Sequence, residues 1–443
     1  MNYEELEQLV RREITQREEE GCDVAEAREV FNKIKIRSRS KLEEILKSLS
    51  KISPTVDFPY KEPSDLLGIR DERLEGPRRI NLKIPDGELL DKIYGGWLGR
   101  CAGCLLGKPV EGLKKEQIEE WLKIADAYPL RNYFPAVSGP PEWLVERVKR
   151  LEERETGVLL GEISHMARDD DIDYTVMGLH ILETYGLNFT TMNVGESWLY
   201  LLPYWQVYTA ERVAYRNLVN GLVPPETAIY MNPYREWIGA QIRADMWGYV
   251  TPGRPELGAE MAYRDASFSH VKNGMYGEMF VSAMISAAFA TNDIGEIIKV
   301  GLSEIPKQSR LAEAVRDVVA WSKKYSDWKD AWKKVIEKYG QYHPVHTINN
   351  LALVLLGLLY GDGNYERSIT ISVMGGLDTD CNGATTGSIL GVILGAKNLP
   401  EKWIKPLNDR IESFVLGFDN SRISDLAIRT FKLAKTVLTR EAG

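Results

Sequence analysis

The 443-residue sequence predicts an all-α fold. Apolar residues recur at helical spacing in many segments, and no run alternates apolar and polar residues as a half-buried strand would. Hydrophobic types make up 44% of the chain and charged types 27%, an ordinary globular composition with enough residues for a large core. The apolar runs are shorter than the roughly 18 to 20 residues that cross a bilayer, so we interpret them as core helices.

The first 88 residues are expected to lie outside the main domain. Over 1–50, apolar residues such as Leu6 and Leu9 stand at helical spacing among Lys, Arg and Glu, which predicts a charged helical extension. Over 51–88 prolines are frequent and periodic apolar residues are few, which indicates either a linker or a wrapping arm. The main domain is therefore expected over 89–435.

Four segments of the main domain have the clearest helical pattern. In chain order they read "DYTVMGLHILETYG", "GEMFVSAMISAAFA", "LAEAVRDVVAWSKKY" and "NNLALVLLGLLYG". Their apolar residues are dense enough to predict helices in the protein core.

Glycine recurs at every fourth position in two further segments. These glycines are Gly95, Gly99, Gly103 and Gly107, and then Gly383, Gly387, Gly391 and Gly395. Because positions i and i+4 share one face of a helix, each segment would present a flat glycine ridge. Four interior glycines cost a helix roughly 3 to 4 kcal/mol relative to alanine. We expect a close approach of two helices to offset this cost.

Charge and cysteine content exclude several classes of protein. The net charge of -8 provides no basic surface for phosphate backbones or anionic lipids, so nucleic acid and membranes are not expected partners. The N-terminus has no apolar segment typical of a secretory signal, and we interpret the protein as cytoplasmic. Four cysteines are too few for a disulfide scaffold, and the CxxC at Cys101 and Cys104 lacks a second ligand pair.

Three short segments gather carboxylates at predicted helix ends. "RDDDIDYT" contains Asp169, Asp170 and Asp171, "GGLDTDCNG" contains Asp378 and Asp380, and "GKPVEG" contains Glu111. For each segment taken alone, the alternative interpretation is that its carboxylate caps a helix. One aspartate is enough for a cap. Consecutive carboxylates repel one another, and a hard divalent cation would balance them. Together the segments therefore favour a metal site over capping.

These segments and "GGWLGRCAGCLLGKPVEG", in this order, resemble the signatures of the ADP-ribosylglycohydrolase family from about Leu89 to Leu399. The resemblance implies a compact orthogonal bundle of helices as a catalytic domain. It also implies a centre of two Mg²⁺ ions, with Mn²⁺ as an alternative, and hydrolysis of the bond at the anomeric carbon of an ADP-ribosyl group. The implied metal ligands are Asp169, Asp170, Asp171, Asp378 and Asp380; the implied catalytic residues are Glu111, Asp171 and Asp378; and the implied substrate-binding residues are Gly239, Arg243, His270 and Asn382.

The sequence also departs from the family pattern. Cys104 stands where the first signature has Asp, and Cys381 stands where the last has Thr or Ser as a metal ligand. A thiol is a poor ligand for Mg²⁺, so the second metal is expected to be bound differently, and the substrate is expected to differ. Two alternative functions follow, namely a hydrolase of nucleosides or other small N-ribosyl compounds, and a catalytically silent ADP-ribose-binding protein.

The expected mechanism places the carboxylates around a ribose. Metal ions would bind the 2′ and 3′ hydroxyls, and Glu111 or one aspartate would take a proton from the attacking water. Negative charge stabilises the oxocarbenium-like transition state of glycosidic cleavage. Four aromatic residues are candidates either for a stacking wall or for core packing: Trp198, Tyr204, Trp205 and Tyr208.

Overall fold

The computed structural model describes residues 2–34 and 38–440 and confirms the all-α prediction. The N-terminal part contains α1 (Tyr3–Glu19), α2 (Ala25–Asn32), α3 (Arg39–Leu49) and α4 (Leu66–Glu72). The chain continues through α5 (Asp86–Gly107), η1 (Lys108–Val110), α6 (Lys115–Ile124), α7 (Glu142–Glu153), α8 (Asp170–Tyr185), α9 (Thr191–Leu201), η2 (Tyr204–Gln206), α10 (Ala210–Val219) and α11 (Glu226–Ile229).

The second half is also helical, apart from one short hairpin. It contains η3 (Gln241–Arg243), α12 (Asp245–Tyr249), α13 (Pro255–Ala266), α14 (Lys272–Ala288), α15 (Ile294–Leu302), α16 (Arg310–Lys324), α17 (Trp328–Tyr339), α18 (Thr347–Gly361), α19 (Tyr365–Met374), α20 (Thr379–Leu394), η4 (Ala396–Asn398), α21 (Glu401–Ile404), η5 (Lys405–Leu407) and α22 (Ile423–Arg440). Strands β1 (Arg410–Glu412) and β2 (Asn420–Arg422) pair antiparallel, with Ile411 opposite Ser421. Within the described residues, no helix is long and apolar enough to cross a membrane.

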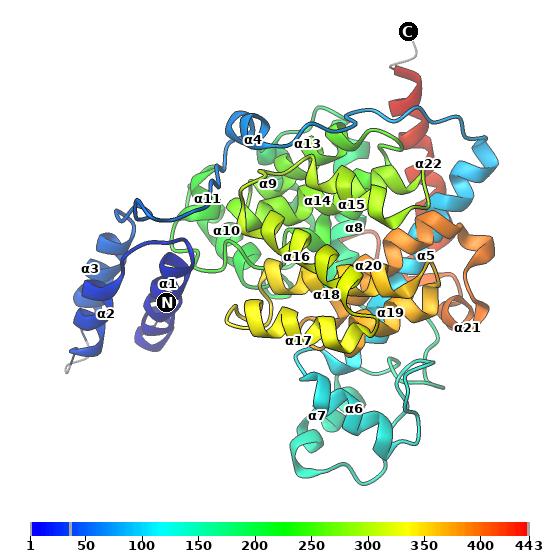
Figure 1. The fold of residues 1–443 in the computed structure, drawn as a ribbon, viewed down its shortest axis with the longest axis horizontal. Helices are drawn as coiled ribbons and strands as arrows, with labels where there is room; N and C mark the ends of the chain where they lie inside the picture. The colour runs from blue at the N-terminus through cyan, green and yellow to red at the C-terminus, as the bar shows by residue number, and fades with distance from the viewer. Residues whose placement is uncertain (1, 35–37, 441–443) are drawn as a thin grey trace.

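Helices α5 and α20 pack against each other at the centre of the main domain (Figure 1). Their glycine ridges face each other in antiparallel pairs: Gly95 with Gly391, Gly99 with Gly387, and Gly103 with Gly383. A Cβ added to any of these glycines would lie 2.0 to 2.3 Å from the partner's carbonyl oxygen. The predicted close approach is therefore present. Gly107 instead faces Thr379, and Gly395 ends α20 at a positive φ of 76°.

The N-terminal helices form a hydrophobic cluster of their own, separate from the main core. In Figure 1, α1, α2 and α3 lie to one side of the larger bundle. Buried ion pairs join this part to the rest, because Arg235 contacts both Glu13 and Glu20 at 2.8 Å. The N-terminal extension is therefore helical, and buried ion pairs attach it to the main domain.

The proline-containing segment lies against the main domain. Glu62 pairs with Arg310 at 2.7 Å, and Arg73 pairs with the buried Glu304 at 2.7 Å. After α4 the chain runs over α13 towards α5 (Figure 1). These contacts hold the segment against the main domain, and its role as a linker or a wrapping arm stays a prediction.

Candidate active site and metal centre

The packing of α5 on α20 brings Glu111 next to the second acidic segment. Because the helices are antiparallel, the C-terminus of α5 meets the N-terminus of α20, and Thr379 Oγ1 donates a hydrogen bond to Gly107 O at 2.8 Å. Just beyond, Gly112 N donates to Leu377 O at 2.8 Å. Leu377 has a φ of 64°, an unusual conformation for a residue with a side chain. The loop of Glu111 and the loop before Asp378 are thus held together.

Helix α5 also positions the first acidic segment, at the start of α8. Asp169 caps α8 by accepting a hydrogen bond from Asp171 N at 3.0 Å, and it accepts another from Lys108 Nζ at 2.6 Å. Arg100, buried in α5, donates to the backbone oxygen of Asp171 at 2.7 Å and to its Oδ1 at 3.1 Å. One helix therefore aligns both acidic segments.

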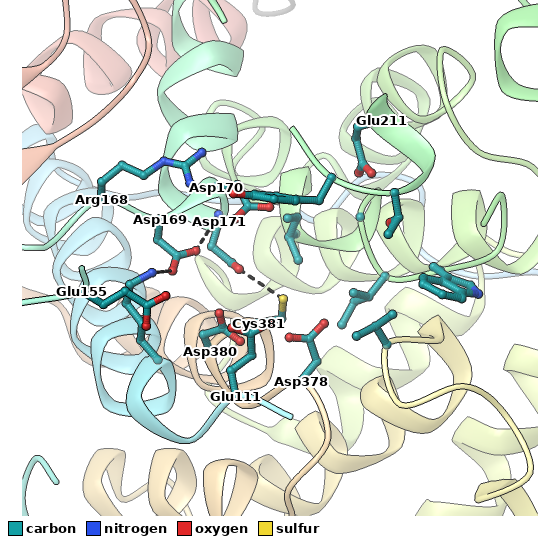
Figure 2. A pocket seen from close by; sticks show the side chains of 18 of the residues that line it. Glu111, Glu155, Arg168, Asp169, Asp170, Asp171, Glu211, Asp378, Asp380 and Cys381 are labelled. Carbon is teal, nitrogen blue, oxygen red and sulfur yellow. Dashed lines mark hydrogen bonds and ion pairs between the residues drawn. The ribbon is translucent and has the colours of Figure 1, made fainter. Parts of the chain in front are cut away.

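The acidic segments line one cavity of about 410 Å³. Figure 2 shows Asp169 to Asp171 on one side and Glu111, Asp378 and Asp380 on the other, with the sulfur of Cys381 between them. The carboxylates in the lining are Glu111, Glu155, Asp169, Asp170, Asp171, Glu211, Asp378 and Asp380. The basic residues are Lys108, Arg150 and Arg168. Negative charge therefore dominates the pocket.

Burial, and then the nearness of other carboxylates, shifts the pKa values of these groups. Burial, and then the charge of Asp169, raises the pKa of Asp170 to about 8. Burial, and then Asp378, raises the pKa of Glu111 to about 7. The pKa of Asp380 is also raised, first by burial and then by Glu111. Asp169 is the exception: burial raises its pKa, but the charge and hydrogen bond of Lys108, together with Arg168 and the backbone N of Asp171, outweigh burial and lower it.

The carboxylates fit a hard divalent cation, while two thiols beside them do not. Oxygen and sulfur atoms come together in two groups, each within 4.8 Å: Cys104 with Asp169 and Asp171, and Asp378 with Asp380 and Cys381. Asp380 is only 6% exposed, and its Oδ1 has no hydrogen-bond partner among the described residues. A buried oxygen without a donor favours a bound cation, and Mg²⁺ and Mn²⁺ prefer such oxygen ligands to thiols.

Of the four residues expected to bind substrate, the structure brings only Gly239 to the pocket wall. A Cβ there would lie 1.8 Å from Glu211 Oε1, so only glycine leaves room for this carboxylate. Arg243 is buried beneath the wall and pairs with Asp265 at 2.6 Å and Glu211 at 3.2 Å. By these contacts it holds Glu211 in place.

His270 and Asn382 are fully buried and do not line the cavity. His270 Nδ1 lies 2.8 Å from Ser269 Oγ, and Asn382 Nδ2 donates to Asn350 Oδ1 at 2.9 Å. Asn350 Oδ1 also accepts from the backbone N of Asp378 at 3.1 Å, so Asn382 supports the acidic loop indirectly. A direct contact of these residues with substrate stays a prediction.

Asp173 is buried among protein donors and does not face water. It accepts hydrogen bonds from Arg168 at 2.9 Å, Ser413 at 2.7 Å and the backbone N of Phe414 at 3.0 Å. Its role is to fix Arg168, which lines the pocket.

The aromatic candidates divide between the core and the pocket. Trp198 is buried in the core and Trp205 is 72% exposed, while Tyr208 lines the cavity. Sequence reasoning missed Trp237, which lines the cavity and stacks on His343 with ring centroids 4.0 Å apart. It also missed Lys108, Glu155 and Glu211 as pocket residues. Only Lys108 had a local signal, since it stands in the same short segment as Glu111.

Comparison with known proteins gives the family and the fold. A family model described as ADP-ribosylglycohydrolase matches residues 85–436. A solved structure described as an ADP-ribosylglycohydrolase-related protein complex is similar, with 17% identity and a TM-score of 0.50, over 79% of this chain and 99% of that chain. At this identity the likeness shows a shared fold. A search of curated proteins finds no match.

Proposed function

Since the chain belongs to the ADP-ribosylglycohydrolase family and is a hydrolase of glycosidic bonds, we propose that it cleaves the anomeric bond of an ADP-ribosyl group with a divalent cation. The observation that carries this proposal is the convergence of three distant acidic segments on one cavity of about 410 Å³. Ligand pockets typically have volumes of roughly 300 to 1,000 Å³, so the cavity is large enough for a nucleotide-like group.

The residues of the pocket have distinct roles in this proposal. Asp170, Asp378 and Asp380 would hold the cation, because they line the cavity without a basic partner among the described residues. A bound divalent cation polarises water and binds ribose hydroxyls. Glu111, whose pKa is raised to about 7, is suited to take the proton from the attacking water near neutral pH. The surrounding carboxylates stabilise positive charge at the anomeric carbon.

The proposal is tested by offering the protein three classes of substrate. ADP-ribosylated arginine, ADP-ribosylated serine and free nucleosides are incubated with Mg²⁺, with Mn²⁺ or with a chelator, and released ribosyl product is measured by chromatography. We expect metal-dependent release of ADP-ribose. We expect the variant Asp378→Asn to lose activity, while Asp71→Asn, on the exposed surface of α4, retains it.

Three results would contradict the proposal. Full activity with chelator, or in Asp378→Asn, would exclude the metal centre. Turnover of free nucleosides alone would favour the nucleoside hydrolase. Binding of ADP-ribose without any turnover would favour the silent binding protein.

A further inference from the structure

Of the two groups of possible metal ligands in the pocket, the one formed by Cys104, Asp169 and Asp171 is already neutralised by donors of the chain itself. Both oxygens of Asp169 accept hydrogen bonds, Oδ1 from Asp171 N and Oδ2 from Lys108 Nζ. Asp171 is engaged as well, by Arg100 at 3.1 Å and by the thiol of Cys381 at 3.2 Å. The third member of this group is Cys104, whose thiol is a poor ligand for a hard cation.

Within the described residues, the other group, Asp378 and Asp380 with Cys381, has no such neutralisation, and the same holds for Asp170 and Glu111, which line the same cavity. Among the described residues, no Lys, Arg or His side chain forms an ion pair with Asp170, Asp378, Asp380 or Glu111. Asp380 Oδ1 lacks a hydrogen-bond partner within the part of the chain that the structure describes, and only 6% of the residue is exposed. These are the carboxylates that still require a cation.

Lys108 is built into the site. It opens η1 directly after α5, precedes Pro109, and its side chain is 15% exposed. Gly107, the last residue of α5, packs against the backbone of Thr379 directly before this turn. An ammonium 2.6 Å from Asp169 would repel a second divalent ion placed beside the same carboxylate.

We propose that the pocket binds a single divalent cation, at Asp378 and Asp380 with Asp170, and that the ammonium of Lys108 takes the place of a second cation beside Asp169. This inference rests on the proposed function and specifies its metal stoichiometry. In this proposal Lys108 is a fixed positive charge that aligns the start of α8. Asp169 pairs with Lys108 and does not bind a metal ion.

The test is the number of ions bound, measured with Mn²⁺ by calorimetry and by electron paramagnetic resonance. We expect one Mn²⁺ per chain in the wild type. In Lys108→Met, a neutral side chain of similar length, we expect two, with the spectral broadening of neighbouring Mn²⁺ ions. The matched control Lys149→Met removes an exposed lysine of α7 and is expected to bind one.

Affinity provides a second readout if Lys108→Met does not fold. Asp380→Asn is expected to weaken Mn²⁺ binding at least tenfold, and Asp169→Asn less than threefold. Two ions in the wild type, one ion in folded Lys108→Met, or equal losses in the two aspartate variants would overturn the inference and leave the proposed function standing. Absence of Mn²⁺ binding in the wild type would overturn both.

Discussion

Replacing Gly103 by alanine tests whether the contact between α5 and α20 places the active site. Alanine is the better helix former by about 0.8 to 1 kcal/mol, so local propensity alone predicts a more stable protein. In the structure, a Cβ at Gly103 would lie 2.0 Å from the carbonyl oxygen of Gly383 and 2.6 Å from its carbonyl carbon. Both atoms belong to the backbone, so the helices must separate by about 1.4 Å to reach an ordinary contact of 3.4 Å.

The expected cost follows from this separation. Overpacking a core costs about 1 to 3 kcal/mol, and this case belongs at the upper end because no side chain can rotate away. After the gain in helix propensity, we expect a net loss of about 2 kcal/mol in the free energy of unfolding. Lys108 and Glu111 follow directly after α5, and a displacement of about 1 Å in an active site lowers the rate on the order of 100-fold.

Chemical denaturation followed by circular dichroism measures the first effect, and the rate of ADP-ribose release measures the second. Gly87→Ala is the matched control on the same helix, because an added Cβ there has no neighbour within 4 Å. It is expected to be as stable as the wild type or more stable. If Gly103→Ala matches Gly87→Ala in stability and activity, the ridge does not position the site.

Three further predictions concern charge. Asp380→Asn should raise the melting temperature of the metal-free protein, because it removes the cost of burying this carboxylate and, second, its repulsion with Glu111. The same variant should abolish stabilisation by Mg²⁺, and a lower melting temperature would contradict this prediction. Folding raises the pKa of Asp170 from 3.8 to about 8, so the metal-free native state binds one proton more than the unfolded state between these pH values. The stability of the metal-free protein should therefore fall from pH 5 to pH 8, and saturating Mg²⁺ should reduce this fall in thermal melts. A stability that rises over this pH range would refute the prediction. Arg235→Met removes the most buried partner of Glu13 and Glu20, leaving Arg17 for both and Lys272 for Glu20. This should cost about 3 kcal/mol, the lower end of the range for breaking a buried ion pair, and should expose α1 to limited proteolysis. The control Arg11→Met, on the exposed face of α1, should do neither.

Much of the fold could be predicted because its signals are local. Helical spacing identified the long core helices, and the spacing of Gly99 and Gly103 predicted a close helix contact that the structure contains. The acidic segments were found by the same kind of reasoning, since consecutive carboxylates at a helix start exceed what capping needs. By contrast, no local pattern indicated Glu211 or Trp237, which reach the pocket only through the packing of their segments.

The sequence by itself determined which residues carry the negative charge and that two glycine-lined helices must meet. Only the tertiary structure decided which carboxylates are neutralised within the chain. Lys108 and Asp169 are separated by 61 positions, and their contact depends on where α5 ends relative to the start of α8. Electrostatic energy depends on distance in space and on burial, and neither follows from spacing along the chain. The division of the acidic pocket into a paired side and an unpaired side is therefore a property of the packed molecule.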